Sequence, residues 1–230
     1  MLRTEGARSM KIGIIGAGHI GGTLARRLVA VGHEVKIANS RGSQTLVDLA
    51  RESGAKAVTV ADAVKDVGLI IVTIPEKNIP VLGRSVFEHV PPDVVIVDTG
   101  NYYPRERDGR IAAIEEGTPE SVWMSGQIGR PVIKVFNNIY AQHLLENGKP
   151  YGTVGRIALP VAGDDAAAKK QVMALVDQLG FDPVDAGSLA ESWRQQPGTP
   201  VYCGDLDAAG VRKALAEASP VRTEAFKAQA

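Results

Sequence analysis

The chain alternates between short apolar runs and segments whose apolar residues recur every three or four positions. Residues 11–15 form a run rich in β-branched side chains, which is typical of a strand buried on both faces. Apolar residues then recur at helical spacing through Val31, and Gly32 follows where a helix is expected to end. A second buried strand is indicated at residues 34–38. The pattern therefore predicts a strand, a turn, a helix and a second strand in this order.

The same alternation continues along the rest of the sequence. Further strands are predicted at residues 57–60, 69–74, 94–97, 132–136, 157–162 and 181–184. Helices are predicted at residues 41–54, 61–66, 79–89, 119–127, 164–179, 189–196 and 205–218, and residues 102–117 are expected to form a polar surface excursion. Strands that alternate with helices favour an α/β fold. We expect a Rossmann-like, doubly wound, mostly parallel sheet with helices on both faces and a short helical C-terminal segment.

Three glycines follow the first strand directly, at the spacing Gly16-x-Gly18-x-x-Gly21. This spacing between a strand and a helix is the dinucleotide-binding fingerprint. Gly16 permits the tight turn, Gly18 lets the backbone approach a pyrophosphate, and Gly21 lets helix and strand pack closely. The free N–H groups and the dipole at a helix N-terminus favour an anion there. We therefore expect a dinucleotide pyrophosphate to contact Gly16, Ala17, Gly18, His19, Ile20 and Gly21.

The end of the second strand indicates which dinucleotide binds. A site for NAD usually has an acidic residue there, which accepts a hydrogen bond from the ribose 2′-hydroxyl. Here the stretch is Asn39-Ser40-Arg41, without an acid. Ser40 and Arg41 can donate hydrogen bonds to a 2′-phosphate. The sequence therefore favours NADP(H) as the cofactor.

Polar residues at the ends of later strands complete the predicted cofactor site. In an open parallel sheet, ligands gather beyond the carboxyl ends of the strands. Asp98 is expected mainly to hold its own turn, as Asp commonly does. The remaining predicted cofactor contacts stand at the ends of the fourth, fifth and sixth strands, namely Thr73, Ile74, Pro75, Thr99, Asn101 and Asn137.

Composition narrows the setting in which the protein works. The chain has 230 residues and no net formal charge, and its basic residues do not cluster, so a nucleic-acid footprint is not expected. The single cysteine, Cys203, excludes an intrachain disulfide and fits a cytoplasmic location. The longest apolar runs are too short to span a bilayer. We expect a disordered leader at residues 1–10, an NADP-binding Rossmann domain at 11–190 and a helical segment packed on it at 191–230.

Five segments resemble one known family. In chain order they are GIIGAGHIGGTLARRL, NSR, TIP, VAGDD and GFDPVDAG, and together they resemble the NADP oxidoreductases that depend on coenzyme F420, an 8-hydroxy-5-deazaflavin. The resemblance covers nearly all of residues 11–190. It implies that residues 16–21 bind pyrophosphate, that Ser40 and Arg41 bind the 2′-phosphate, and that residues 73–75 contact the nicotinamide half.

Three segments depart from this family's pattern. They are residues 102–129, 136–139 and 191–203. The resemblance therefore implies NADP(H) binding more directly than it implies a deazaflavin as the second substrate. We predict an NADPH-dependent oxidoreductase that transfers hydride between NADP(H) and a deazaflavin such as coenzyme F420, a flavin or another small acceptor.

A carbonyl acceptor would also require a proton donor. Tyr140, His143 and Lys134 are the candidates near the end of the sixth strand, although a position inside a strand argues against Lys134. No catalytic residue is assigned from the sequence. The expected partner is a small-molecule acceptor, and neither a nucleic acid, a membrane nor a metal is expected. A homodimer is also predicted, in which the C-terminal segment covers a neighbouring pocket.

Two other functions stay open. One is a dehydrogenase of the β-hydroxyacid type, although the expected pair of lysine and asparagine and a long C-terminal helical domain are not evident in the sequence. The other is a non-catalytic module that senses NADP(H), which would fit a chain without an evident acid–base pair. Turnover of NADPH with any acceptor would distinguish an enzyme from such a module.

Overall fold

The computed structural model describes residues 9–229 and contains a six-stranded parallel sheet. Its strands are β1 (Lys11–Ile15), β2 (Glu34–Ala38), β3 (Lys56–Ala57), β4 (Leu69–Val72), β5 (Val95–Asp98) and β6 (Ile133–Lys134). Their order in space is β3-β2-β1-β4-β5-β6, and each neighbouring pair is parallel. This order is that of a Rossmann fold and confirms the predicted α/β class.

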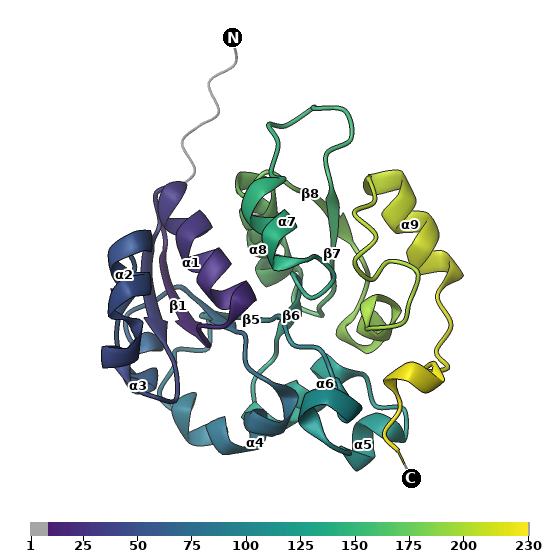
Figure 1. Cartoon of the computed structure of the whole chain (residues 1–230), viewed down its shortest axis with the longest axis horizontal. Helices are drawn as coiled ribbons and strands as arrows, with labels where there is room; N and C mark the ends of the chain where they lie inside the picture. The colour runs from purple at the N-terminus through teal and green to yellow at the C-terminus, as the bar shows by residue number, and fades with distance from the viewer. Residues whose placement is uncertain (1–8, 230) are drawn as a thin grey trace.

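Helices cover both faces of the sheet (Figure 1). The α-helices are α1 (His19–Ala30), α2 (Val47–Ser53), α3 (Val60–Ala63), α4 (Ile79–Leu82), α5 (Ala112–Glu115), α6 (Glu120–Ile128), α7 (Ala141–Glu146), α8 (Ala166–Gln178) and α9 (Ala208–Glu217). Short 3-10 or π turns are η1 (Ser43–Leu46), η2 (Glu76–Asn78), η3 (Arg84–Val86), η4 (Pro104–Asp108), η5 (Leu189–Gln195) and η6 (Glu224–Phe226).

The core lies in two layers, one on each face of the sheet. Leu69 and Ile71 of β4 belong to the cluster that includes residues of α1 and α8. Ile70 and Val72 of the same strand belong to the cluster that includes residues of α4 and α6. All four side chains are buried, because successive residues of a strand point to opposite faces. The uninterrupted apolar run at 69–72 is thus explained by burial on both sides.

The last two strands form a separate two-stranded parallel sheet. β7 (Ala158–Val161) pairs with β8 (Asp182–Asp185), and Figure 1 shows this pair beside the main sheet, between α8 and α9. A single antiparallel bridge between Lys134 and Ala162 connects the main sheet to it. Val184 and Val211 pack together in a third small core beneath α9.

Several predicted elements are shorter in the structure than expected. The strand predicted at 57–60 ends at Ala57, because Val60 already begins α3. The helix predicted at 79–89 is broken, because α4 ends at Leu82 and Gly83 then adopts a φ of 64°. The strand predicted at 132–136 is reduced to two residues. Asp165 caps α8, since its carboxylate accepts hydrogen bonds from the N–H groups of Ala167 and Ala168.

The prediction of a surface excursion at residues 102–117 is wrong for part of that segment. Tyr102 is fully buried, and Asp108 and Ile114 are buried as well. The Tyr102 hydroxyl accepts a hydrogen bond from the Ile111 N–H at 2.9 Å, which folds the segment back on itself. Its polar composition concealed these few anchoring residues.

Both ends of the described chain are attached to the body of the protein. Ser9 donates a hydrogen bond to the Gly32 carbonyl, whereas the rest of the predicted leader, apart from Met10, lies outside the described residues. Arg105 of η4 donates hydrogen bonds to the carbonyl oxygens of Lys227 and Glu224, at 2.9 and 2.6 Å. Among the helices of residues 9–229, none is long and apolar enough to cross a membrane.

Candidate functional site

The strand order places a crevice at the carboxyl ends of β1 and β4. The chain moves outward from β1 to β3 and then returns to place β4 on the other side of β1. Loops that follow β1 and β4 therefore diverge at this point, which is where open α/β sheets bind their ligands. The glycine loop at 16–21 and the segment at 73–75 both stand at this position.

The space around each glycine of the loop fits the role that the sequence predicts for it. Gly16 has a φ of 115°, and a Cβ atom there would lie 2.2 Å from the Thr73 carbonyl oxygen. A Cβ atom on Gly21 would lie 2.0 Å from the Gly16 carbonyl oxygen, so this glycine allows helix and loop to pack closely. A Cβ atom on Gly18 would meet no atom within 4 Å. The open space at Gly18 is therefore where a pyrophosphate can approach the backbone.

Helix α1 begins directly after this open space. Its N-cap, Gly18, provides no side-chain cap, and the first turn contains no acidic residue. Backbone N–H groups of the first turn have no partner within a helix, and the helix dipole makes this end positive. The start of α1 is therefore prepared for an anion.

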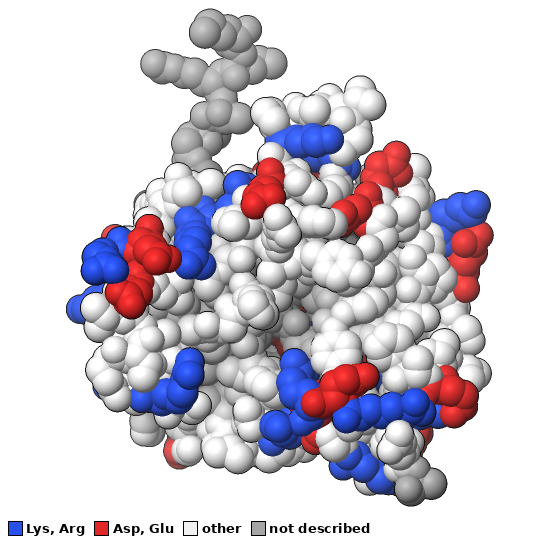
Figure 2. All heavy atoms as spheres, in the orientation of Figure 1, with Lys and Arg blue, Asp and Glu red and all other residues white. Residues whose placement is uncertain are grey.

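A cavity of about 330 Å³ lies between the ends of three strands. Eight of the predicted cofactor contacts line it, namely Gly18, His19, Ile20, Thr73, Ile74, Pro75, Thr99 and Asn101. A second cavity of about 620 Å³ lies on the other side of Gly18 and is lined by Ala17, α1 and α7. In Figure 2 the charged side chains of this face lie mainly toward its edges. The structure thus brings together, around these two cavities, residues that are far apart in sequence.

The predicted 2′-phosphate residues stand at the same edge of the sheet. Ala38, the last residue of β2, pairs with Ile15 of β1. The Asn39 side chain accepts a hydrogen bond from the Arg41 N–H at 2.9 Å and donates one to Thr45 Oγ1 at 2.9 Å, so it shapes the turn. Ser40 and Arg41 are exposed, which leaves their side chains accessible beside the glycine loop.

Asn137 has partners within the protein. Its Nδ2 donates hydrogen bonds to Asn101 Oδ1 at 3.0 Å and to the Gln195 carbonyl oxygen at 2.7 Å, while its Oδ1 accepts one from Gln195 Nε2 at 2.9 Å. The residue is buried. In this geometry Asn137 positions Asn101 and ties it to η5. Direct contact between Asn137 and a cofactor stays a prediction.

Three residues that the sequence analysis did not select also line the cavity, namely Gly100, Tyr103 and Arg107. The Arg107 guanidinium carbon lies 5.0 Å from the centre of the Tyr103 ring, within the range of a cation–π contact. The Tyr103 hydroxyl contacts the hydroxyl of Tyr202. Burial raises the pKa of Tyr103 above its usual value of 10.0, so its phenol is protonated at neutral pH. The available signal was the position of this tyrosine just beyond a strand end.

None of the proton donors considered from the sequence lines this cavity. Lys134 is fully buried, and its amine donates a hydrogen bond to Asp98 Oδ2 at 3.0 Å. His143 Nδ1 lies 2.5 Å from Asp205 Oδ2. Tyr140 is 56% exposed. Among tyrosines, Tyr103 is therefore better placed to contact a substrate in this cavity.

A buried group of charged residues lies beneath the loop after β5. Asp98 Oδ1 accepts a hydrogen bond from the Gly100 N–H at 2.7 Å, which confirms its predicted role in the turn. Asp98 Oδ2 accepts hydrogen bonds from Ser121 and Lys134, and the Lys134 amine also donates to the Gly100 carbonyl at 2.5 Å. These bonds hold the backbone that leads into Asn101. The buried pair of Asp98 and Lys134 thus fixes the position of the backbone that lines the cavity.

Glu76 belongs to the same group and is only 1% exposed. Within the described residues, neither of its carboxyl oxygens has a hydrogen-bond partner. Burial, and next the nearby Asp98, raise the pKa of Glu76 well above its usual value of 4.5. Glu76 therefore keeps its proton to a higher pH than an exposed glutamate does.

Part of the sequence matches a known protein family, and the fold matches several solved structures. Residues 11–102 match the family described as NADP oxidoreductase, coenzyme F420-dependent. The crystal structure of the hypothetical protein SMa0349 from Sinorhizobium meliloti is 30% identical, with a TM-score of 0.71, and the match covers 85% of this chain and 94% of that one. A protein from Arthrobacter sp. FB24, proposed to be an F420-dependent NADP reductase, is 23% identical with a TM-score of 0.65, covering 80% and 87% of the two chains.

One curated relative matches a shorter segment. Protein YjhV of Escherichia coli (strain K12) is 56% identical over 69 residues, which are 30% of this chain and 50% of that protein. The match thus spans half the length of this relative. Together with the glycine loop and the Rossmann strand order, the comparisons relate this chain to known proteins: its residues 11–102 are similar to the NADP oxidoreductases dependent on coenzyme F420.

Proposed function

We propose that this protein is an NADPH-dependent oxidoreductase that transfers hydride between NADP(H) and a small-molecule acceptor. The observation that carries the proposal is the cavity between the ends of β1, β4 and β5, with the open backbone of Gly18 on one side and Thr73 to Pro75 on the other. A dinucleotide fits the residues present, because Gly18 leaves room for its pyrophosphate and the start of α1 favours an anion. Bound NADPH would supply the hydride.

NADP(H) is the preferred nucleotide in this proposal. Ser40 and Arg41 are exposed at the end of β2, beside the glycine loop. A guanidinium can bind a phosphate with two parallel hydrogen bonds, whereas the 2′-hydroxyl of NADH offers no such charge. Thr99, Asn101 and the segment at 73–75 would surround the nicotinamide half.

The acceptor would approach from the side of Tyr103. This ring forms a wall of the cavity together with Asn101 and Arg107, and an aromatic wall favours a flat ring as the second substrate. Coenzyme F420, or a flavin, is therefore the acceptor class to test first. With a carbonyl acceptor, the Tyr103 hydroxyl would donate the proton to oxygen as hydride reaches carbon, and solvent would return a proton to the Tyr103 phenolate once the product leaves.

Thermal unfolding with NADPH and with NADH, in parallel, tests the cofactor site. A ligand at about 100 times its Kd that binds only the folded state stabilises it by about 2.7 kcal/mol, or roughly 5 to 10 °C for a chain of this length. We expect NADPH to raise the midpoint well above the value with NADH. The Arg41→Ala variant should bind NADPH about 10- to 100-fold more weakly and keep its affinity for NADH.

Arg51→Ala is the matched control, because Arg51 is an exposed arginine on the neighbouring helix α2. It should respond to NADPH as the parent protein does. Absence of any shift with either nucleotide would refute the cofactor site. A clear NADPH shift without oxidation of NADPH by coenzyme F420, by FMN or by a quinone would instead favour the non-catalytic sensor.

A further inference from the structure

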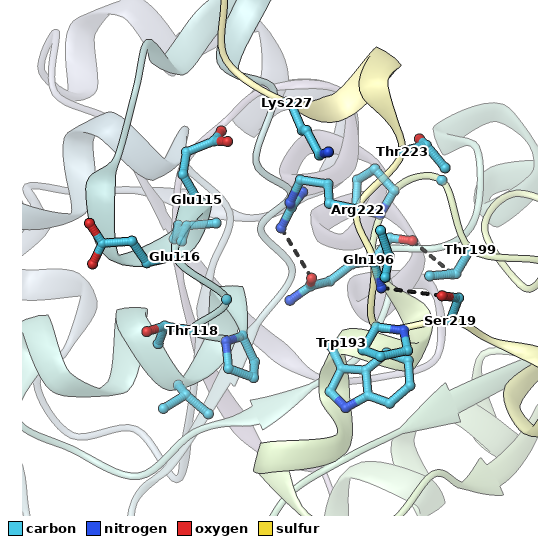
Figure 3. A pocket seen from close by; sticks show the side chains of 18 of the residues that line it. Glu115, Glu116, Thr118, Trp193, Gln196, Thr199, Ser219, Arg222, Thr223 and Lys227 are labelled. Atoms are coloured by element: carbon cyan, nitrogen blue, oxygen red, sulfur yellow. Dashed lines mark hydrogen bonds between the residues drawn. The ribbon is translucent and has the colours of Figure 1, made fainter. Parts of the chain in front are cut away.

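A third cavity, of about 800 Å³, lies away from the glycine loop (Figure 3). Its walls come from α5 and the start of α6, from η5, and from the segment that follows α9. It shares no lining residue with the two cavities beside Gly18. No motif in the sequence pointed to this place, because its walls come from parts of the chain that are distant in sequence.

Two hydrogen-bond donors in its wall have no acceptor among residues 9–229. Arg222 Nη2 donates hydrogen bonds to Glu120 Oε1 at 2.9 Å and to Gln196 Oε1 at 3.2 Å. Because Gln196 Oε1 is the acceptor, the amide orientation is defined and Nε2 is the remaining donor. Within the described part of the chain, Gln196 Nε2 and Arg222 Nη1 are both buried without a partner. Gln196 is only 7% exposed.

Such an arrangement is costly unless a ligand or an ordered water molecule accepts these hydrogen bonds. A buried donor that lacks an acceptor costs about 1–3 kcal/mol, and more when the group is charged. Figure 3 shows Arg222 and Gln196 next to each other in the wall, with Trp193 nearby and Glu116 across the cavity. One charged donor and one amide donor side by side match the two oxygens of a carboxylate.

The other residues that line the cavity further restrict the chemical class of the ligand. Trp193, Pro119 and Val122 provide an apolar surface, including one large flat ring. Glu116 and Glu217 line the cavity as well and are exposed. Their negative charges would repel an anion with two or more charges more strongly than one with a single charge.

We propose that this cavity binds a small monocarboxylate that carries a planar apolar group. Its carboxylate accepts hydrogen bonds from Arg222 Nη1 and Gln196 Nε2, and its apolar part contacts Trp193. Glu120, which pairs with Arg222, also accepts a hydrogen bond from the Tyr102 N–H at 3.2 Å. The site is therefore separated by one ion pair from the segment that carries Tyr103.

Calorimetric titration of the full chain with phenylacetate, without nucleotide, tests this site. Phenylacetamide is the neutral isostere, and we expect it to bind at least about tenfold more weakly, since it loses the charge-assisted hydrogen bond. Gln196→Glu keeps an oxygen for Arg222 but replaces the Nε2 donor with a second, negatively charged oxygen that would repel the ligand carboxylate. This variant should bind phenylacetate at least about tenfold more weakly than the parent.

A second variant blocks the space itself. Thr118 lines the cavity, and Thr118→Trp should abolish binding even if Gln196→Glu is only partly effective. Gln127→Glu is the matched control, because Gln127 lies on α6 outside the cavity lining. Circular dichroism confirms that each variant is folded.

Three results would overturn the proposal. One is equal affinity for the acid and the amide. Another is parental affinity in folded Gln196→Glu and Thr118→Trp. The third is absence of phenylacetate binding at about 10 mM, which corresponds to less than roughly 3 kcal/mol of binding free energy. None of these results bears on the NADPH site, which is measured separately.

Discussion

Replacement of Glu76 by Gln should stabilise the protein, and increasingly so as the pH rises. The Glu76 side chain is almost fully buried, has no hydrogen-bond partner for either oxygen among the described residues, and lies near the negative Asp98. Each factor disfavours its ionised form. A glutamine side chain at this position would have nearly the same shape but could not ionise.

The sign follows from where the proton is bound. In the unfolded chain Glu76 loses its proton near pH 4.5, whereas in the folded protein its pKa is raised well above that value. Between these two pKa values the folded state binds one more proton than the unfolded state, so the free energy of unfolding falls as the pH rises. The slope from this group is about 1.4 kcal/mol per pH unit when the two pKa values are well separated. Above the folded pKa the loss is complete and becomes constant.

Urea denaturation followed by circular dichroism, at several pH values from about 5 to 8, measures this effect. The difference in unfolding free energy between Glu76→Gln and the parent should grow by about 1.4 kcal/mol per pH unit over at least part of this range. Glu88→Gln is the control, since Glu88 is exposed. Parallel curves for the parent and Glu76→Gln across the whole range would refute the raised pKa of Glu76.

Three further changes test other parts of the site. Gly21→Ala would place a Cβ atom 2.0 Å from the Gly16 carbonyl oxygen, so NADPH should cease to shift the thermal midpoint. Gly126→Ala is the control and should keep the shift, because a Cβ atom on Gly126 would meet no atom within 4 Å. Tyr103→Phe should keep NADPH affinity but lower kcat with a carbonyl acceptor about 100-fold or more, and an unchanged kcat would remove Tyr103 as proton donor. Lys134→Met would leave Asp98 without its buried cationic partner and should lower the unfolding free energy, measured by urea denaturation, by about 3–5 kcal/mol. A loss below about 1 kcal/mol would contradict the importance of this ion pair.

The nucleotide side of the site could be predicted from sequence because its determinants are local. Gly16, Gly18 and Gly21 act through spacing within one turn, and their fixed position between a strand and a helix is visible in the residues themselves. The segment at 73–75 could be placed because a parallel sheet brings all strand ends of one kind to one edge. These rules need no knowledge of distant contacts.

The acceptor side could not be predicted in the same way. Tyr103 lines the cavity, and its hydroxyl contacts that of Tyr202, which is 99 residues away in the sequence. Glu76, Asp98 and Lys134 are brought together from the ends of three different strands, and a lysine inside a strand has no periodic signature. The pairing of β7 with β8 in a separate sheet likewise depends on contacts between distant parts of the chain, which the local sequence pattern does not show. The predicted homodimer stays a prediction, which sedimentation at micromolar concentration would test.

The contacts of η4 with the C-terminal segment have a consequence for the order in which the molecule folds. Arg105 bonds to carbonyl groups 119 and 122 residues away, and Phe226 packs with its ring centre 6.4 Å from those of Tyr103 and Tyr202. Contacts that close such long loops carry a high entropic cost and generally form after the shorter-range pairing of strands. We therefore expect the glycine loop and the ends of β1 and β4 to form before the cavity wall that contains Tyr103. A partly folded molecule could then bind a nucleotide before the surface that would contact the second substrate has formed.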